Sequence, residues 1–290
     1  MKSYNLDYNV CTMKVDLHSH SYYSDGVYSP SDVVELANQA KCDLFSLTDH
    51  DTTDGLSEAQ QRADDLSLNF IPGVEISAFW NNRTIHILGL DININNDTLQ
   101  KGLRQNQELR KERAEKIELG LRRAGIKDAL DKTRALSKTG MITRTHFAQM
   151  LIREGYCKDM KSVFRRFLTG KKPGSTSVEW SNFEEVIDWI HLAGGHAVIA
   201  HPFRYRMTQT KIKRMFSEFK EAFGDGVEAI TAMSSEQEIN LCSNWAKDIN
   251  LLISSGSDYH GWPNQRINVG SLKEVPKSDN LIWNHLSWQR

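Results

Sequence analysis

Long apolar runs and closely paired cysteines are both missing from this sequence of 290 residues. No stretch approaches the roughly eighteen apolar residues that a membrane span requires, and the first ten residues lack the apolar segment of a secretion signal. We therefore expect a cytoplasmic protein with no membrane partner. Cys11, Cys42, Cys157 and Cys242 show no CxxC spacing, which is typical of scattered reduced thiols.

Net charge is also nearly absent, at −1, but the charges are unevenly distributed. Residues 101–172 contain 20 basic and 8 acidic side chains, whereas the rest of the chain contains 16 basic and 29 acidic ones. A basic segment inside an acidic framework favours an anionic substrate, held by the basic part while cations neutralise the acidic part. A solvated helix face rich in Lys and Arg is the alternative interpretation.

The sequence does contain histidines and carboxylates, residue types that bind metal ions, at the ends of apolar runs. In VDLHSHSYYSDG, which begins at Val15, side chains two apart share one face of a strand, so His18 and His20 point the same way. Asp25 follows in a loop closed by Gly26, where a carboxylate can complete the ligand set of a divalent cation. Taken alone, an HxH motif is equally compatible with a polar strand end.

Five later stretches repeat this pattern of an apolar run that contains or ends in imidazoles or carboxylates. They supply Asp49 and His50 in KCDLFSLTDHD, Glu75 in LNFIPGVEIS with His86 in TIHILGLD, His201 in AGGHAVIAHP, and Asp258 and His260 in LLISSGSDYH. Buried charges are costly unless they are paired or bound to metal, so the repetition favours a metal site. Imidazole and carboxylate donors without thiolate favour a catalytic site for Mn, Fe or Zn.

Strand and helix patterns alternate around these residues. Ser29 with Pro30 begins a helix, Ser181 begins another with a capping box, and further helices are expected over 53–66, 211–223 and 235–248. We count roughly seven βα-type units, which predicts an α/β fold of mostly parallel strands with the site at their carboxyl ends. Periodicity does not distinguish an ordinary TIM barrel from an open sheet.

Helical patterns replace this alternation between about residues 96 and 179. We interpret the segment as a helical insertion and divide the chain into a first barrel part (12–96), the basic insertion (97–179), a second barrel part (180–275) and a tail (276–290). The tail contains Trp283 and Trp288, and we expect it to pack on the barrel.

The motifs DLHSHSYYSDG, TDHDT, PGVEIS, IHILGL, AHP and GSDYH, in this order, resemble the PHP (polymerase and histidinol phosphatase) superfamily of metal-dependent phosphoesterases. The stretches RKERAEKI, ITRTHFAQMLIREG and AHPFRY resemble its bacterial RNase AM group of 5′-to-3′ exoribonucleases and 3′,5′-nucleoside bisphosphate phosphatases. The resemblance implies a distorted (β/α)7 TIM-like PHP barrel with a helical insertion.

It also implies three metal ions, with Mn²⁺ the favoured ion and Fe or Zn as alternatives. The implied ligands are His18, His20, Asp25, His50, Glu75, His86, His201, Asp258 and His260, with Glu75 bridging. Metal binding lowers the pKa of a bound water toward about 7, and the resulting hydroxide would attack phosphorus without a protein nucleophile. Asp49, His201 and Asp258 are the expected catalytic residues. We expect Asp49 to orient a ligand imidazole, with direct ligation as the alternative, and Asp51 to cap a helix.

Substrate contacts are expected from the basic insertion. Arg110 and Arg113 lie three residues apart on one helix face, a spacing that can grip a phosphate, and exposed arginines on a charged helix are the alternative. Lys111 and Glu112 belong to the same RKER stretch. Arg144 and His146 in TRTH, and Arg204 in AHPFRY, are the further candidates.

The function expected from this resemblance is a phosphoesterase that releases nucleoside 5′-monophosphates from RNA or short oligonucleotides. Dephosphorylation of 3′,5′-bisphosphonucleotides is an additional expected activity, and we favour a monomer. One alternative is a small-molecule phosphatase of the bisphosphonucleotide or histidinol phosphate type. Another is a non-catalytic PHP module that binds nucleic acid. A metal amidohydrolase is a third, although no Lys lies at a suitable strand end to bridge two metals.

Overall fold

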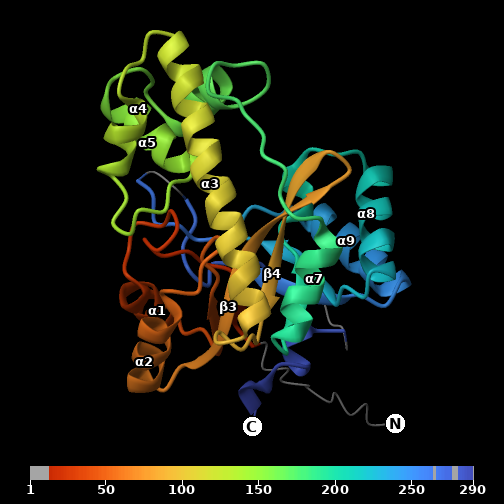
Figure 1. Cartoon of the computed structure of the whole chain (residues 1–290). Helices are drawn as coiled ribbons and strands as arrows, with labels where there is room; N and C mark the ends of the chain where they lie inside the picture. Colours follow the sequence, from red (N-terminus) through yellow and green to blue (C-terminus); the bar gives the residue numbers. More distant parts are fainter. Residues whose placement is uncertain (1–12, 264–265, 276–279, 290) are drawn as a thin grey trace, which may run out of the picture.

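Seven strands form one sheet in which each strand pairs with the next one along the chain. The computed structural model describes residues 13–263, 266–275 and 280–289, shown in Figure 1. The strands are β1 (Val15–Asp16), β2 (Leu44–Leu47), β3 (Asn69–Trp80), β4 (Arg83–Leu90), β5 (His196–Ile199), β6 (Gly226–Thr231) and β7 (Leu252–Gly256). The sheet curves until its edges meet, because Leu17 N donates to Ser255 O at 2.9 Å and Ser19 bridges Tyr259. The predicted seven-stranded barrel is confirmed.

Strand direction departs from the prediction at one place. Pairings β1–β2, β2–β3, β5–β6 and β6–β7 are parallel, but β4 is antiparallel to both of its neighbours. The count of seven βα-type units was wrong here, because β3 and β4 form a hairpin with no helix between them. Asn81 and Asn82 make the turn at φ values of 45° and 59°, a left-handed conformation that asparagine tolerates.

Five helices cover the outside of the barrel (Figure 1). They are α1 (Pro30–Gln39), α2 (Leu56–Leu66), α7 (Phe183–Leu192), α8 (Gln209–Glu221) and α9 (Glu236–Asp248). The capping box at Ser29 is confirmed. The box predicted at Ser181 was wrong by one residue: Asn182 caps α7, because the Ser181 carbonyl accepts from Phe79 N at the end of β3.

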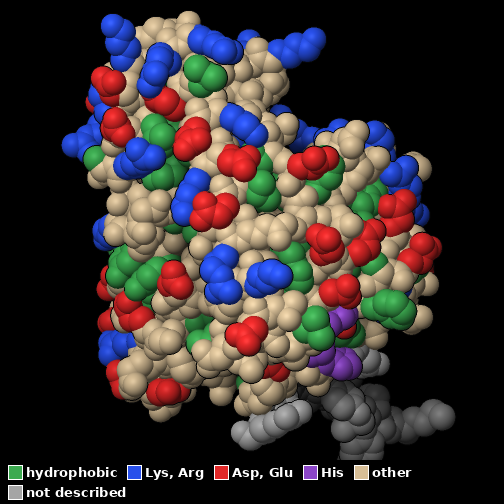
Figure 2. Space-filling model, in the orientation of Figure 1, with side chains coloured by type: hydrophobic (Ala, Val, Ile, Leu, Met, Phe, Trp, Pro, Cys, Tyr) green, Lys and Arg blue, Asp and Glu red, His purple; other side chains and the backbone are tan. Residues whose placement is uncertain are grey.

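The insertion lies between β4 and β5. Its elements are α3 (Asp97–Arg123), α4 (Ala129–Arg134), α5 (Arg144–Arg153), α6 (Met160–Val163) and the π-helix η1 (Phe164–Leu168). The amino-terminal half of α3 packs beside α7, and the short helices gather around its far end (Figure 1), where Ile117, Leu121 and Phe147 belong to a separate hydrophobic cluster. Figure 2 shows Lys and Arg side chains gathered over this end. The domain boundaries at 97 and 179 stay predictions, and residues 12, 276–279 and 290 lie outside the described ranges.

The described part of the tail contains two short 3₁₀-helices, η3 (Ile282–Asn284) and η4 (Ser287–Gln289). Ile282, Trp283 and Leu286 are buried in one cluster with the barrel-interior residues Val15 and Leu88. The barrel is therefore a packed core rather than a pore. No helix in the described ranges is both long and apolar enough to cross a membrane. Three free cysteines, Cys42, Cys157 and Cys242, are buried there, whereas Cys11 lies outside those ranges.

Candidate metal centre

The two histidines after β1 converge as their spacing predicts. His18 Nε2 and His20 Nε2 lie 3.1 Å apart, and both rings are fully buried. Ser19, on the opposite face, donates its hydroxyl to Ser46 O inside the sheet. Strand alternation therefore aims two imidazole nitrogens at one point.

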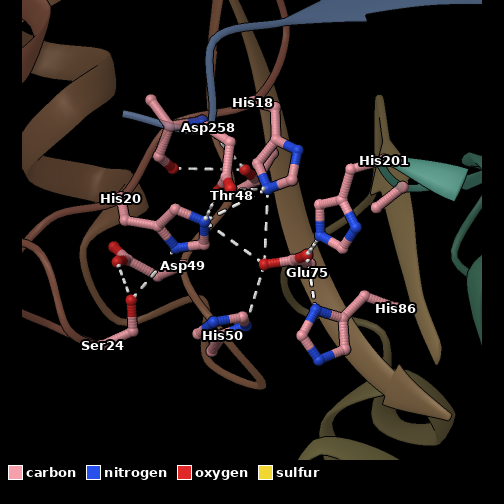
Figure 3. A network of polar contacts seen from close by, with 12 residues as sticks. His18, His20, Ser24, Thr48, Asp49, His50, Glu75, His86, His201 and Asp258 are labelled. Carbon is pink, nitrogen blue, oxygen red and sulfur yellow. Dashed lines mark hydrogen bonds and ion pairs between the residues drawn. The ribbon is translucent and has the colours of Figure 1, made fainter. Parts of the chain in front are cut away.

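Glu75 of β3 lies at the centre of the cluster in Figure 3, with imidazoles around both carboxylate oxygens. His86 Nδ1 and His201 Nε2 lie 2.8 and 3.0 Å from Oε1. On the other side, Oε2 lies 3.3 Å from His18 Nε2, 3.2 Å from His20 Nε2 and 2.9 Å from His50 Nδ1. One carboxylate thus contacts five imidazoles from four segments of the chain, the position expected of a bridging ligand.

The remaining three predicted ligands lie beside this group. Asp258 Oδ1 is 3.0 Å from His20 Nε2, and His260 Nε2 is 3.3 Å from Asp25 Oδ1. The His20 and His260 rings stack at 4.1 Å. All nine residues therefore meet at one end of the barrel, although they come from stretches that are far apart in the sequence.

The position of His86 follows from the direction of β4. His86 lies opposite Ser77 in the β3–β4 register, near the amino end of its strand. Because β4 runs antiparallel to β3, this amino end lies at the same edge of the barrel as the carboxyl ends of the parallel strands. A residue before the middle of β4 can therefore join ligands that follow the other strands.

The donor atoms fit metal ions. Three overlapping groups have donor atoms mutually close enough to hold an ion: His20, Asp25, His50 and His260; His18, His20, Glu75 and Asp258; and His50, Glu75 and His86. Within the described residues, the buried atoms Asp25 Oδ1, Glu75 Oε2, His50 Nδ1 and His201 Nδ1 make no hydrogen bond of acceptable geometry. Buried polar atoms without hydrogen bonds are costly, and coordination to a cation satisfies them.

Charge in the cluster is strongly coupled. Burial opposes ionisation of Glu75, but His50 and the other imidazoles hold the pKa of this carboxyl well below its ordinary value. Burial lowers the pKa of His50 to about 4. The pKa of His20 is raised to about 10 in spite of burial, because its ring contacts the carboxylates of Asp258 and Glu75. The central carboxylate is therefore ionised, which suits coordination of a cation.

Glu228 of β6 is a functional residue that the sequence reasoning missed. It is 1% exposed, its Oε1 lies 3.0 Å from His18 Nδ1, and its Oε2 accepts from His201 N at 2.7 Å. A carboxylate on the second ring nitrogen of a ligand histidine fixes the orientation of that ring and raises its basicity. The available signal was a single acidic residue inside the apolar stretch GVEAI.

Asp49 lies behind the cluster. Its carboxylate accepts from Ser21 N at 2.8 Å, from Ser21 Oγ at 2.6 Å and from Ser24 Oγ at 2.6 Å, and Ser24 Oγ lies 3.3 Å from His20 Nδ1. The network reaches a ligand imidazole through a serine hydroxyl (Figure 3). This geometry supports the orienting role expected for Asp49 and places the residue away from direct ligation.

Asp51 does not cap a helix, and that prediction was wrong. Its Oδ1 accepts from Ser77 N and Asn106 Nδ2, both at 2.8 Å, and its Oδ2 accepts from Arg110 Nε at 2.7 Å. The following helix begins at Leu56, too far along the chain for Asp51 to reach its first amides. Asp51 instead joins the barrel to α3.

A cavity of about 390 Å³ opens above the ligands. Its lining contains seven of the nine predicted ligands and four of the predicted substrate residues. These are Asp25, His50, Glu75, His86, His201, Asp258 and His260, and Arg110, Arg113, Arg144 and Arg204. Arg204 Nη1 donates to Asp258 Oδ2, and Arg110 pairs with Asp51. Among the described residues, no ion pair forms at Arg113 or Arg144.

Three other predicted substrate residues do not line this cavity. Lys111 is exposed and pairs with Glu108, and Glu112 is exposed and lies 3.6 Å from Lys116. Both point away because they sit beside Arg110 and Arg113 on a helix, where adjacent residues face different directions. His146 is buried, and its Nδ1 lies 3.2 Å from Thr143 N in the capping box of α5.

Comparison with known proteins agrees with this geometry. The model of the PHP domain family matches residues 16–232. A 3′,5′-nucleoside bisphosphate phosphatase from Chromobacterium violaceum is 40% identical, covering 94% of this chain and 96% of its own length. A 5′-3′ exoribonuclease from Haemophilus influenzae is 38% identical over 94% of this chain and 98% of its own. The 5′-3′ exoribonuclease Rnm of Escherichia coli is 37% identical over 92% of each chain.

Two solved structures share the fold. One, described as an amidohydrolase from Chromobacterium violaceum with bound sulfate and no metal, is 40% identical with a TM-score of 0.89, covering 94% of this chain and 95% of that one. The other, from Bifidobacterium adolescentis and described as a proposed metal-dependent phosphoesterase, is 24% identical with a TM-score of 0.78 over 92% and 93% of the two chains.

Proposed function

Since the chain belongs to the PHP domain family, we propose that it is a metal-dependent phosphoesterase that acts as a 5′-to-3′ exoribonuclease. It would release nucleoside 5′-monophosphates and also remove the 3′-phosphate of nucleoside 3′,5′-bisphosphates. The observation that carries this proposal is one cavity in which seven of the nine predicted metal ligands face Arg113 and Arg144, two arginines that form no ion pair with a described carboxylate.

The metal part of the proposal is three divalent cations, with Mn²⁺ favoured and Fe or Zn as alternatives. Nine nitrogen and oxygen donors exceed the four to six positions around one such ion, and the three overlapping donor groups suit a cluster. When bound, these cations would activate water and neutralise the charge that develops on the phosphoryl oxygens. Glu228 and Asp49 would hold the ligand imidazoles in place.

The phosphate part rests on Arg113 and Arg144. Burial, together with the charge of Arg110, lowers the pKa of both guanidinium groups, and neither group forms an ion pair with a described residue. The Arg113 guanidinium lies 5.0 Å from the centre of the Trp180 ring, which holds the group without neutralising it. A phosphate entering the cavity would supply the missing negative charge and accept paired hydrogen bonds.

The size of the cavity favours an exonuclease. A volume of about 390 Å³ is near the lower end for small-ligand pockets, roughly 300–1,000 Å³, so it suits one nucleotide rather than a duplex. Single-stranded ends, whose bases are unstacked, can enter such a pocket. The same volume also suits a free bisphosphonucleotide, which keeps a small-molecule phosphatase as the second candidate function.

Product analysis with Mn²⁺ tests the proposal on three substrates: a short 5′-phosphorylated RNA, the same RNA with a 5′-hydroxyl, and adenosine 3′,5′-bisphosphate. Stepwise release of mononucleotides from the phosphorylated RNA is the expected result. Turnover of the bisphosphate alone would make the protein a small-molecule phosphatase. Turnover of none of the three, with metal bound, would contradict the phosphoesterase proposal.

A further inference from the structure

One part of the cavity wall carries no ionisable group. Of the lining residues, only Thr143, Thr145, Phe164 and Trp262 are uncharged at every pH of interest, and the others are ligands or arginines. The phosphates and the metal ions of the proposed reaction occupy the charged part. The base of a nucleotide is a flat, weakly polar ring system that needs a different surface, and aromatic side chains provide it.

Trp262 is held in place by the metal centre itself. Its indole Nε1 donates to the carbonyl of Asp25 at 2.6 Å, and its ring centre lies 4.3 Å from that of His260. Both partners belong to predicted ligands. The indole is half-buried, so part of its surface remains open to the cavity. Its position is therefore set relative to the reacting phosphate before any substrate arrives.

Phe164 reaches the same cavity from the insertion. It is the first residue of the π-helix η1, and its carbonyl accepts from Thr169 N at 3.0 Å, the five-residue spacing of a π turn. Such turns are rare and frequently lie at functional sites. The ring is half-buried and lines the cavity with Trp262, so the barrel and the insertion contribute one aromatic side chain each.

The Thr143 hydroxyl has little capacity left to read the edge of a base. The Thr143 hydroxyl already accepts from Thr145 N and His146 N, because it caps α5. Stacking on aromatic rings does not distinguish one base from another, since every base has a π face. This wall therefore suits a base of any identity.

From these contacts we propose that Phe164 and Trp262 form a platform on which the purine or pyrimidine base of the terminal nucleotide stacks, without selecting among bases. This inference rests on the proposed function, because it takes the ligand to be a nucleotide. It adds a source of affinity that the metal ions and arginines do not provide. An enzyme that degrades RNA end by end needs such tolerance, since every base reaches the site in turn.

Calorimetric titration with products tests the platform without requiring turnover. Adenosine 5′-monophosphate, uridine 5′-monophosphate and the base-free 1,2-dideoxyribose 5-phosphate are each titrated into the Mn²⁺-loaded protein. We expect both nucleotides to bind within a few-fold of each other and at least about tenfold more tightly than the base-free analogue. Equal affinity for the base-free analogue would overturn the proposal.

Substitutions assign the effect to the two rings. Phe164→Leu and Trp262→Leu should each weaken nucleotide binding about tenfold and leave the base-free analogue unaffected, whereas Phe164→Tyr and Trp262→Phe should retain most of the affinity. Phe223→Leu, at a ring that is 81% exposed, is the matched control. Equal losses for the nucleotides and the analogue would show a merely structural role. Failure of RNA hydrolysis with normal base-dependent binding would reject the proposed activity and keep the platform.

Discussion

Arg110 of α3 donates from its Nε to Oδ2 of Asp51 at 2.7 Å, and both side chains are buried. The pair joins the barrel loop after β2 to the helix that carries the insertion. It also distinguishes two arginines on one helix face, because Asp51 neutralises Arg110 while Arg113 forms no ion pair with a described residue.

Asp51→Asn should destabilise the protein by about 3 kcal/mol, because it leaves the buried Arg110 charge without its partner. Burial opposes ionisation of Asp51, but Arg110 and the amides of Ser77 and Asn106 lower its pKa, so the native residue is charged. Urea unfolding at neutral pH measures the change. Glu112→Gln, which removes an exposed pair with Lys116, is the control and should cost less than about 1 kcal/mol. Equal losses in both variants would contradict the anchoring role.

Arg113→Met should raise KM for adenosine 3′,5′-bisphosphate about 10- to 100-fold, the loss expected for a hydrogen bond between charged groups. The value of kcat should change little if Arg113 binds substrate and transition state equally. Steady-state kinetics on the Mn²⁺-loaded enzyme separate the two parameters. Arg104→Met, at an exposed position of the same helix, provides the comparison. Unaltered KM in the Arg113 variant would remove this residue from the phosphate site.

Glu228→Gln should weaken metal binding about 10- to 100-fold while the fold remains intact, because His18 loses the carboxylate that orients its ring. Competition with a fluorescent chelator measures the affinity for Mn²⁺. Glu221→Gln, an exposed residue at the end of α8, should bind metal like the wild type. Chelator treatment should abolish hydrolysis in the wild type and in both variants. Added Mn²⁺ should restore hydrolysis at a lower concentration in the wild type and in Glu221→Gln than in Glu228→Gln.

His196→Gln should destabilise the protein more at about pH 5.5 than at about pH 9. The carboxylate of Asp225, whose Oδ1 lies 3.7 Å from His196 Nδ1, raises the pKa of His196 above its ordinary value, although burial acts in the opposite direction. Protonated His196 therefore stabilises the folded state. This contribution is fully present below the ordinary histidine pKa of about 6.5 and disappears as pH rises through the higher pKa of the folded state. Unfolding at both pH values measures the difference. In an Asp225→Asn background the pH dependence should vanish, and its persistence would assign it elsewhere.

The sequence by itself, through motifs that resemble the PHP superfamily, determined the identity of the nine clustered residues and the kind of barrel that carries them, which periodicity alone did not. Two-residue alternation places His18 and His20 on one face, and parallel strands bring their carboxyl ends to one edge. Those rules operate over a few residues, so they can be read from the chain. Local hydrogen bonds explain why the cap at Ser29 was readable too.

Only the tertiary structure decided which charged residues pair with one another and which remain unpaired. Asp51 and Arg110 are 59 positions apart, and Glu228 and His18 are 210 apart, so no local pattern shows that they meet. The same holds for the β3–β4 hairpin, which lets His86 join the cluster from a reversed strand. The energy of a buried charge depends on its surroundings in three dimensions, and the residue type alone does not reveal them.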